Sequence, residues 1–296
     1  MFEYERSLPL GFKEFSISRK DGYTVRDISY LSPLGGSIPA YLVVPNKEGQ
    51  SFPAVVFLHP GQGNRTTFLS EAEDLASKGI ISLLIDAPSM RKSPPKDLSQ
   101  EQELTLIVEG VVDIQGYIQT VIDLQRGIDL LSSFENVDSE RLVYVGHSLG
   151  ATWGGVLAGV DERIKAYVLM AGFSSVSKWH KTSEHPLAVL IRNQLSGEQF
   201  NTFITELEPL DAVHYIKKAA PASLFFQFSL NDEFISKEQA KTYYTVASSP
   251  KEVAWYETDH LFTGCDTAYR ERMQWIMGQL GLDSYNHLQL EGNKND

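Results

Sequence analysis

The sequence predicts an α/β protein with a mostly parallel central sheet and helices on both faces. Runs that are apolar along their whole length alternate with helical stretches through most of the chain. This alternation is typical of a parallel sheet that helices cover on both sides. Hydrophobic residues make up 42% and charged residues 22% of the chain, which is ordinary for a folded globular protein. Because the chain has 296 residues, we expect a single domain over residues 1–296.

The first part of the chain predicts an antiparallel edge of this sheet. Tight turns at residues 21–22 and 35–36 separate three short β-favouring runs, and this spacing leaves no room for a helical crossover. The three runs are Phe15–Ser18, Val25–Leu31 and Ile38–Val44.

From residue 54 onward, the pattern predicts strands that alternate with helices. Gly79 is predicted to end the first of these helices as its C-cap. The predicted strands are Ala54–Leu58, Ile80–Ile85, Leu142–Val145, Ala166–Met170, Leu224–Phe228 and Val253–Tyr256. The predicted helices are Thr66–Lys78, Gln115–Phe134, a stretch after Ser148, and Thr267–Leu280.

Two segments interrupt the alternation, Pro88–Asp113 and Ser174–Tyr215. The second separates two strands by far more residues than a crossover needs, and it is rich in apolar side chains. Long insertions in compact domains are usually functional or disordered, and so apolar a segment is not expected to be disordered. We therefore expect residues 174–215 to form a small helical cap over the carboxyl edge of the sheet, with a surface helical hairpin as the alternative. The polar residues Gln289–Asp296 are expected to fray.

Charge and cysteine content limit the classes of function. A formal net charge of −12 and a pI near 5.1 argue against nucleic acid or an anionic membrane as the main partner. The single cysteine, Cys265, excludes an intramolecular disulfide and fits a reducing compartment. The N-terminal residues lack a basic start followed by an apolar run, and no stretch approaches about 18 apolar residues. We therefore expect a soluble cytoplasmic protein.

The segment Leu142–Gly150 carries the strongest functional signal. It reads LVYVGHSLG, an apolar strand that runs directly into the pentapeptide GHSLG at residues 146–150. The pattern G-x-S-x-G is the nucleophile elbow, a sharp turn between a strand and a helix that exposes the serine hydroxyl. Glycines are needed there because side chains would clash with the neighbouring strand and helix. Ser148 is therefore the predicted nucleophile.

A serine hydroxyl needs a base within hydrogen-bond reach, and with this elbow the partners follow in the order serine, acid, histidine. His260 is the predicted base because it alone among the later histidines directly follows a late strand. Asp232 is the predicted acid, since it stands at the turn after the preceding strand, where it would fix the tautomer of the imidazole. Glu233 is a direct competitor for this role, and Asp259 is a weaker one.

The tetrahedral intermediate of such a reaction needs backbone N–H donors for its oxyanion. Leu149 is expected to supply one because it follows the nucleophile. The second donor is expected from the loop after the strand Ala54–Leu58, where Pro60 has no N–H, so Gly61 is the first candidate and Gln62 the next. No Lys-Ser/Thr pair follows this loop, so it is not predicted to cradle a phosphate. The reaction requires neither a metal ion nor an organic cofactor.

On these residues the chain resembles the α/β-hydrolase superfamily, and within it the dienelactone-hydrolase-like and acetyl-xylan-esterase-like serine esterases. The resemblance covers residues 25–281 and implies the α/β-hydrolase fold with ester chemistry. The chain departs from the family pattern at Pro60 and Ser229, where glycine is usual, and it has Ser148 where dienelactone hydrolases proper have a cysteine. The segments that carry the resemblance are PAVVFLHPGQGN (53–64), LLIDAP (83–88), YVGHSLGA (144–151), FSLNDEFI (228–235) and TDHLF (258–262).

Together, the residues and the resemblance predict a serine hydrolase that cleaves small-molecule carboxylic esters through an acyl-enzyme intermediate. A peptidase or amidase of prolyl-oligopeptidase type and an acyltransferase are the alternatives. A non-catalytic binding member of the fold is the least favoured, because all three positions of the triad are filled. Cys265 is predicted to be a buried small hydrophobe, and the sequence predicts no particular oligomeric state.

Overall fold

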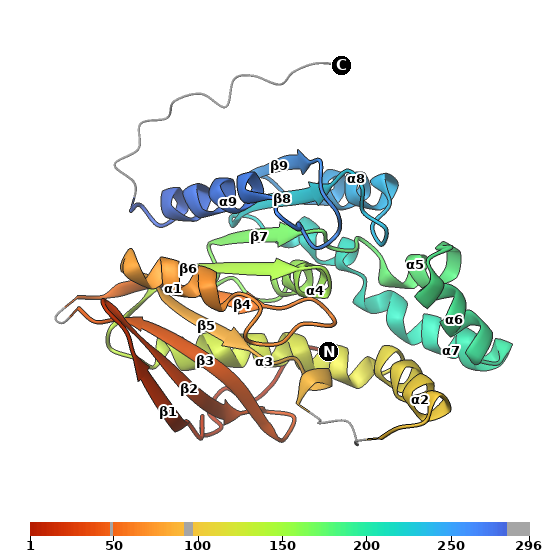
Figure 1. Cartoon of the computed structure of the whole chain (residues 1–296), viewed down its shortest axis with the longest axis horizontal. Helices are drawn as coiled ribbons and strands as arrows, with labels where there is room; N and C mark the ends of the chain where they lie inside the picture. The colour runs from red at the N-terminus through yellow and green to blue at the C-terminus, as the bar shows by residue number, and fades with distance from the viewer. Residues whose placement is uncertain (48–49, 92–96, 283–296) are drawn as a thin grey trace, which may run out of the picture.

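The computed structural model describes residues 1–47, 50–91 and 97–282 (Figure 1). The predicted polar tail, Gln289–Asp296, lies outside the described residues. Within them, one mixed sheet of nine strands has the order β1-β2-β3-β5-β4-β6-β7-β8-β9. The strands are β1 (Lys13–Arg19), β2 (Tyr23–Leu31), β3 (Ser37–Pro45), β4 (Phe52–Leu58), β5 (Ile81–Ile85), β6 (Val137–His147), β7 (Ala166–Met170), β8 (Ser223–Ser229) and β9 (Lys251–Tyr256).

The direction of the strands follows the prediction. Strands β1, β2 and β3 form an antiparallel edge, and β3 is also antiparallel to β5. From β5 to β9, every neighbouring pair is parallel. Strands β4, β5 and β7 are buried at every residue, which explains why their sequences are apolar throughout. The predicted fold class is confirmed.

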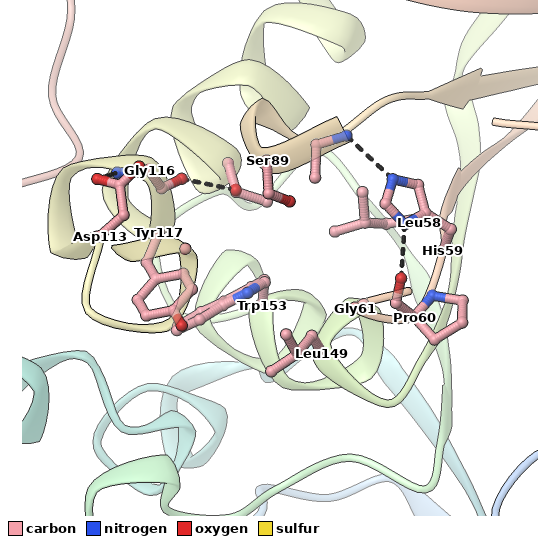
Figure 2. A pocket seen from close by; sticks show the side chains of 14 residues that line it. Leu58, His59, Pro60, Gly61, Ser89, Asp113, Gly116, Tyr117, Leu149 and Trp153 are labelled. Carbon is pink, nitrogen blue, oxygen red and sulfur yellow. Dashed lines mark hydrogen bonds between the residues drawn. The ribbon is translucent and has the colours of Figure 1, made fainter. Parts of the chain in front are cut away.

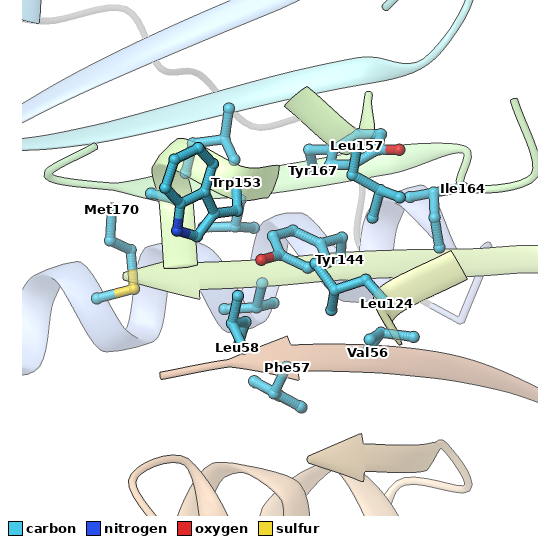
Figure 3. Close-up of a cluster of buried hydrophobic side chains, with 14 of the residues drawn as sticks. Val56, Phe57, Leu58, Leu124, Tyr144, Trp153, Leu157, Ile164, Tyr167 and Met170 are labelled. Carbon is cyan, nitrogen blue, oxygen red and sulfur yellow. The ribbon is translucent and has the colours of Figure 1, made fainter. Parts of the chain in front are cut away.

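Helices cover both faces of the sheet. On one face, Phe225 of β8 packs against Trp275, with ring centroids 5.5 Å apart. On the other face, Tyr144 and Tyr167 lie in a buried cluster with Leu124 and Leu157 (Figure 3). The first face carries α1 (Leu69–Ser77) and α9 (Asp266–Gln279), and the second carries α3 (Ile114–Ser132), α4 (Leu149–Leu157) and α8 (Lys237–Val246).

Most predicted elements agree with the structure to within a few residues, and β7 has its predicted bounds. Strand β6 begins at Val137, earlier than the predicted Leu142. Gly79 has a φ of +87° directly after the end of α1, as a C-cap glycine requires. Helix α8 was not predicted, because few apolar residues mark it. Its start is signalled instead by Ser236, whose side chain accepts a hydrogen bond from the backbone N–H of Gln239.

Residues 174–215, which we call the cap, fold into three helices and short 3₁₀ turns. The cap lies at the end of the sheet toward which the arrows of β6, β7 and β8 point (Figure 1). Hydrogen bonds to Asp211 link the end of the cap to its beginning. The Asp211 carboxylate is 3% exposed and accepts hydrogen bonds from the hydroxyls of Ser175 and Ser177, each at 2.5 Å. The cap helices are α5 (Val176–Thr182), α6 (Pro186–Gln194) and α7 (Gly197–Leu207).

The other interruption contains α2 (Gln100–Val111), which has no buried residue. A short 3₁₀ helix, η1 (Pro88–Met90), follows β5. Among the described residues, no helix combines the length and the apolarity needed to cross a membrane.

Candidate active site

Ser148 stands on a strained turn between β6 and α4. Its φ is +55° and its ψ is −117°, a conformation that residues other than glycine rarely adopt. Hydrogen bonds to and from the Ser148 backbone hold the turn. The Ser148 N–H donates to the carbonyl of Met170 at 2.8 Å, and the hydroxyl of Thr152 donates to the Ser148 carbonyl at 3.0 Å. The turn holds Ser148 at the carboxyl edge of the sheet.

Both glycines of the elbow are required by close approach of the backbone. A Cβ atom at Gly146 would lie 2.5 Å from the carbonyl carbon of Gly150. A Cβ atom at Gly150 would lie 2.2 Å from the carbonyl oxygen of Leu58. Neither position can therefore hold a side chain without moving the strand or the helix, as the sequence argument expected.

The structure brings Ser148, His260 and Asp232 together. The Ser148 Oγ lies 2.9 Å from Nε2 of His260, and Nδ1 of His260 lies 2.9 Å from both carboxylate oxygens of Asp232. Because a carboxylate only accepts hydrogen bonds, the Nδ1 atom carries the proton, and Nε2 of the neutral ring accepts the serine hydroxyl. The His260 and Asp232 side chains are 4% and 2% exposed, so this chain of hydrogen bonds is shielded from water.

Asp232, and neither of its competitors, is hydrogen-bonded to the His260 imidazole. Its Oδ1 atom accepts hydrogen bonds from the backbone N–H groups of Phe234 and Ile235, at 2.8 and 2.7 Å, and these turn the carboxylate inward. Glu233 is exposed. Asp259 is exposed as well, and its carboxylate accepts from the N–H of Thr263 at 2.9 Å.

The loop after β4 is a tight turn beside Leu149. The N–H of Gly63 donates to the carbonyl of Pro60 at 2.8 Å, which leaves Gly61 and Gln62 as the central residues of the turn. A Cβ atom at Gly61 would lie 3.0 Å from Cδ1 of Leu149. Gly61 is therefore adjacent to the residue that follows Ser148. In the part of the chain that is described, the N–H of Gly61 has no hydrogen-bond acceptor.

His59 holds this turn in place. The N–H of Ala87 donates to Nε2 of His59 at 3.0 Å, so the proton of the neutral ring is on Nδ1, which donates to the carbonyl of Pro60 at 2.7 Å. Burial lowers the pKa of His59 and so favours this neutral tautomer near pH 7. Pro60 thus fits the loop through its carbonyl, although it lacks the N–H that a glycine would have.

A small cavity lies beside the two expected oxyanion donors (Figure 2). It has about 40 Å³ of room for the centre of a water molecule, and it is lined by Gly61 and Leu149 among others. Tyr117 and Trp153 also line it, with their ring centroids 4.9 Å apart. Gln62 does not line it. Of the two candidates in the loop, Gly61 is thus the one that faces this space.

Aromatic side chains that the sequence did not indicate as part of the site pack around His260. Phe234 packs against the His260 ring at 4.7 Å between centroids, and His185 of the cap packs against Phe234 at 4.1 Å. The indole N–H of Trp179, also in the cap, donates to the carbonyl of Phe234 at 2.9 Å. The position of Phe234 two residues after Asp232 was the only signal in the sequence.

His147 is a second neighbour that the sequence did not single out as functional. It precedes Ser148 in the elbow, and its ring centroid is 5.2 Å from that of His260. Its Nε2 atom lies 2.7 Å from the carbonyl oxygen of His260. The motif G-x-S-x-G allows any residue at position 147, so only the folded chain shows this contact.

Cys265 is half-buried, at the N-cap position of α9, rather than buried as predicted. It follows Gly264, whose φ of +64° turns the chain into the helix, so the thiol stays near the surface. Over residues 1–47, 50–91 and 97–282, no group of three or more His, Cys, Asp or Glu side chains is arranged to hold a metal ion.

The strand order, the elbow after β6, and the acidic and histidine loops after β8 and β9 define an α/β hydrolase with a serine at the nucleophile position. More particularly, the chain belongs to the acetyl xylan esterase (AXE1) family, whose model matches residues 5–275. This confirms the resemblance seen in the sequence.

Individual relatives are distant. An acetyl esterase, Axe7A, from Xylanibacter ruminicola is 24% identical over an alignment of 260 residues that covers 82% of this chain and 56% of that protein. The chain thus spans little more than half the length of this relative. Two acetyl xylan esterase structures show the same fold. The one from a Paenibacillus species has a TM-score of 0.75 at 23% identity, covering 91% of this chain and 89% of that one. The one from a Thermoanaerobacterium species has a TM-score of 0.73 at 18% identity, covering 94% and 90%.

Proposed function

We propose that the chain hydrolyses carboxylic esters of small molecules through a triad of Ser148, His260 and Asp232 and an acyl-enzyme intermediate. The observation that carries this proposal is the continuous chain of hydrogen bonds from the serine hydroxyl to the carboxylate, with 2.9 Å at each step. Membership of the acetyl xylan esterase family supports ester hydrolysis as the reaction. The shielded setting of the triad supports catalysis, because buried charges interact more strongly than charges in water.

The proposed reaction has two halves. First, Oγ of Ser148 attacks the ester carbonyl carbon while its proton passes to Nε2 of His260, and Asp232 stabilises the imidazolium that forms. His260 then donates this proton to the departing alkoxide, which leaves as an alcohol, and the acyl group stays on Ser148. In the second half, His260 takes a proton from water, the hydroxide oxygen attacks the acyl carbon, and the carboxylic acid is released as Ser148 regains its proton.

The oxyanion of each tetrahedral intermediate is proposed to accept hydrogen bonds from the N–H groups of Leu149 and Gly61. Leu149 is the first residue of α4, so its N–H has no partner within the helix and lies at the positive end of the helix dipole. Gly61 is preferred over Gln62 because it adjoins Leu149 and lines the same cavity.

Short acyl groups are the proposed substrates. The cavity beside Gly61 and Leu149 is small, with about 40 Å³ open to the centre of a water molecule. The aromatic pair Tyr117 and Trp153 also lines it. This space lies beside the proposed oxyanion donors and has room for a group the size of acetyl. The relative from Xylanibacter ruminicola is named as an acetyl esterase, which supports the same acyl size.

A comparison of Ser148→Ala with the wild-type chain tests the proposal. Hydrolysis of p-nitrophenyl acetate should fall by roughly 10⁴-fold or more, and the wild type should prefer the acetate over the octanoate. Ser82→Ala is the matched control. Ser82 is fully buried in β5, and its hydroxyl has no partner among the described residues, so its loss should leave turnover unchanged.

Ester turnover that survives in Ser148→Ala contradicts the proposed mechanism. Faster cleavage of peptide p-nitroanilides than of esters would favour a peptidase or amidase instead. Preferential transfer of the acyl group to an added alcohol, in place of water, would favour an acyltransferase.

A further inference from the structure

The histidine loop must reach far across the sheet to meet the nucleophile. His260 follows β9, and Ser148 follows β6, with β7 and β8 between them in the sheet. The beginning of the loop is fastened to the turn after β8, where the N–H of Asn231 donates to the carbonyl of Thr258 at 3.3 Å. The other end of the loop, at His260, needs an anchor near Ser148, because catalysis depends on placing the reacting groups to within about 1 Å.

His147 anchors this end of the loop. Its Nε2 atom is 2.7 Å from the carbonyl oxygen of His260. Among the described residues, this is the only hydrogen bond that the His260 backbone makes. His147 is the last residue of β6 and directly precedes Ser148, so it links the backbone of the base to the strand that holds the nucleophile. The side chain is 4% exposed, so water does not compete for the bond.

The protonation state of His147 suits this contact. Burial, and after it the nearby His260, lowers the pKa of His147 to about 4. The ring is therefore neutral near pH 7 and carries one proton. Because the carbonyl of His260 can only accept, that proton is on Nε2. A neutral ring also places no positive charge beside His260 when His260 itself becomes protonated.

The backbone after His260 is strained. Phe262 has a φ of +57°, a backbone conformation that is strained for a residue other than glycine. Its ring lies edge-on to His147, with centroids 5.8 Å apart. The loop thus contains a residue in a strained backbone conformation. His147 contacts the loop on both sides of this bend, at His260 and at Phe262.

We infer that His147 is a positioning residue, which holds the His260 backbone through its Nε2–H and keeps the imidazole aligned between Asp232 and Ser148. The inference rests on the proposed function. The alternative role for His147 is packing alone, as a buried ring under the loop. The two roles differ in one respect, because only positioning depends on the hydrogen-bond donor.

Three substitutions separate the donor from the ring. His147→Phe keeps an aromatic ring and removes the donor. His147→Gln restores a donor whose amide reaches about as far as Nε2, whereas the amide of His147→Asn stops one methylene short. His180→Phe is the control, since His180 is 2% exposed and equally neutral, with a pKa lowered to about 4 by burial, but lies in the cap.

The measurement is kcat and KM for p-nitrophenyl acetate, near pH 8. We expect His147→Phe to lower kcat by about 10- to 100-fold, the scale of a small misplacement of a catalytic group, with KM changed less than about threefold. His147→Gln should recover most of this loss, and His180→Phe should keep the wild-type kcat. The low-field proton resonance of Nδ1–H in His260 should persist in His147→Gln and weaken in His147→Phe.

Full kcat in His147→Phe, or an equal loss in the Gln and Asn variants, overturns the inference. If His147→Phe does not fold, the Gln and Asn pair still decides, because positioning requires Gln to be the faster by about tenfold. Failure of the proposed function is recognised separately. Ester turnover retained by Ser148→Ala would refute the catalytic triad itself. Loss of turnover in Ser148→Ala together with full activity of His147→Phe would refute only the positioning role of His147.

Discussion

Two helices drawn at the carboxyl end of the sheet in Figure 1, α2 and α7, share their local signals but differ in how they are held. Each begins with a serine whose side chain accepts from a glutamine N–H three residues later, while the glutamine side chain bonds back to the serine. Each also carries an apolar stripe at positions i, i+3, i+4 and i+7, which predicts a packed face. The stripes are Leu104, Ile107, Val108 and Val111 in α2, and Phe200, Phe203, Ile204 and Leu207 in α7.

Burial separates the two helices. Phe203, Ile204 and Leu207 of α7 are buried, whereas α2 buries no residue and Ile107 is 47% exposed. Helix α7 lies against α5, where the ring of His180 packs on Phe203 at 5.2 Å between centroids. An N-terminal capping box and an apolar stripe therefore define where a helix forms, whereas its tertiary contacts decide how much stability it contributes.

Ile204→Ala is expected to have the largest effect, because it removes a buried side chain from the α7 stripe. Ile204 is 5% exposed, and this truncation in a packed core costs about 2–5 kcal/mol of the free energy of unfolding. Urea unfolding followed by circular dichroism measures it. A loss below about 1 kcal/mol would mean that α7 is as weakly held as α2.

His180 should give the cap a dependence on pH that α2 lacks. Burial, followed by the charge of Arg192, lowers its pKa to about 4 from a usual value near 6.5. The unfolded chain therefore takes up the proton at higher pH than the folded chain. The stabilising contribution is complete above about pH 6.5, and it is lost as the pH falls toward about 4.

His180→Phe removes this dependence. The difference in the free energy of unfolding between the wild type and His180→Phe should change by up to roughly 3 kcal/mol between about pH 7.5 and pH 4. Urea unfolding at several pH values gives this difference directly, and His147 contributes equally to both proteins. A difference that stays constant with pH contradicts the buried, neutral state of His180.

Ile107→Ala is expected to have the smallest effect and sharpens the comparison with Ile204→Ala, since the chemical change is the same. Nearly half of the Ile107 side chain is already exposed, so the free energy of unfolding should change by no more than about 0.5 kcal/mol. The same urea titration measures it. A loss as large as that of Ile204→Ala would show that Ile107 is held by packing as Ile204 is.

The parts of the molecule that could be predicted from the sequence depend on local patterns. The apolar runs of β4, β5 and β7 and the GHSLG elbow carry their signals within a few residues, and chain order then indicated His260. Helix α8 could not be predicted in this way, because its apolar stripe is weak and its start depends on the N-cap residue Ser236.

The choice between Asp232 and Glu233 required the folded chain. The two carboxylates are neighbours in one turn, and their direction is decided by the N–H groups of Phe234 and Ile235, which bind Asp232. The contact between His147 and the carbonyl of His260 joins residues 113 positions apart, so no local pattern contains it. Long-range contacts of this kind set the geometry of the site, and they are what the sequence alone leaves open.

The most direct test of the central claim, that Ser148 is the nucleophile and His260 its base, is covalent labelling by a fluorophosphonate probe followed by mass mapping of the modified peptide. A single adduct is expected on Ser148 in the wild-type chain, formed far more slowly in His260→Ala. An adduct on a different serine, or ester turnover by a chain that forms none on Ser148, would contradict it.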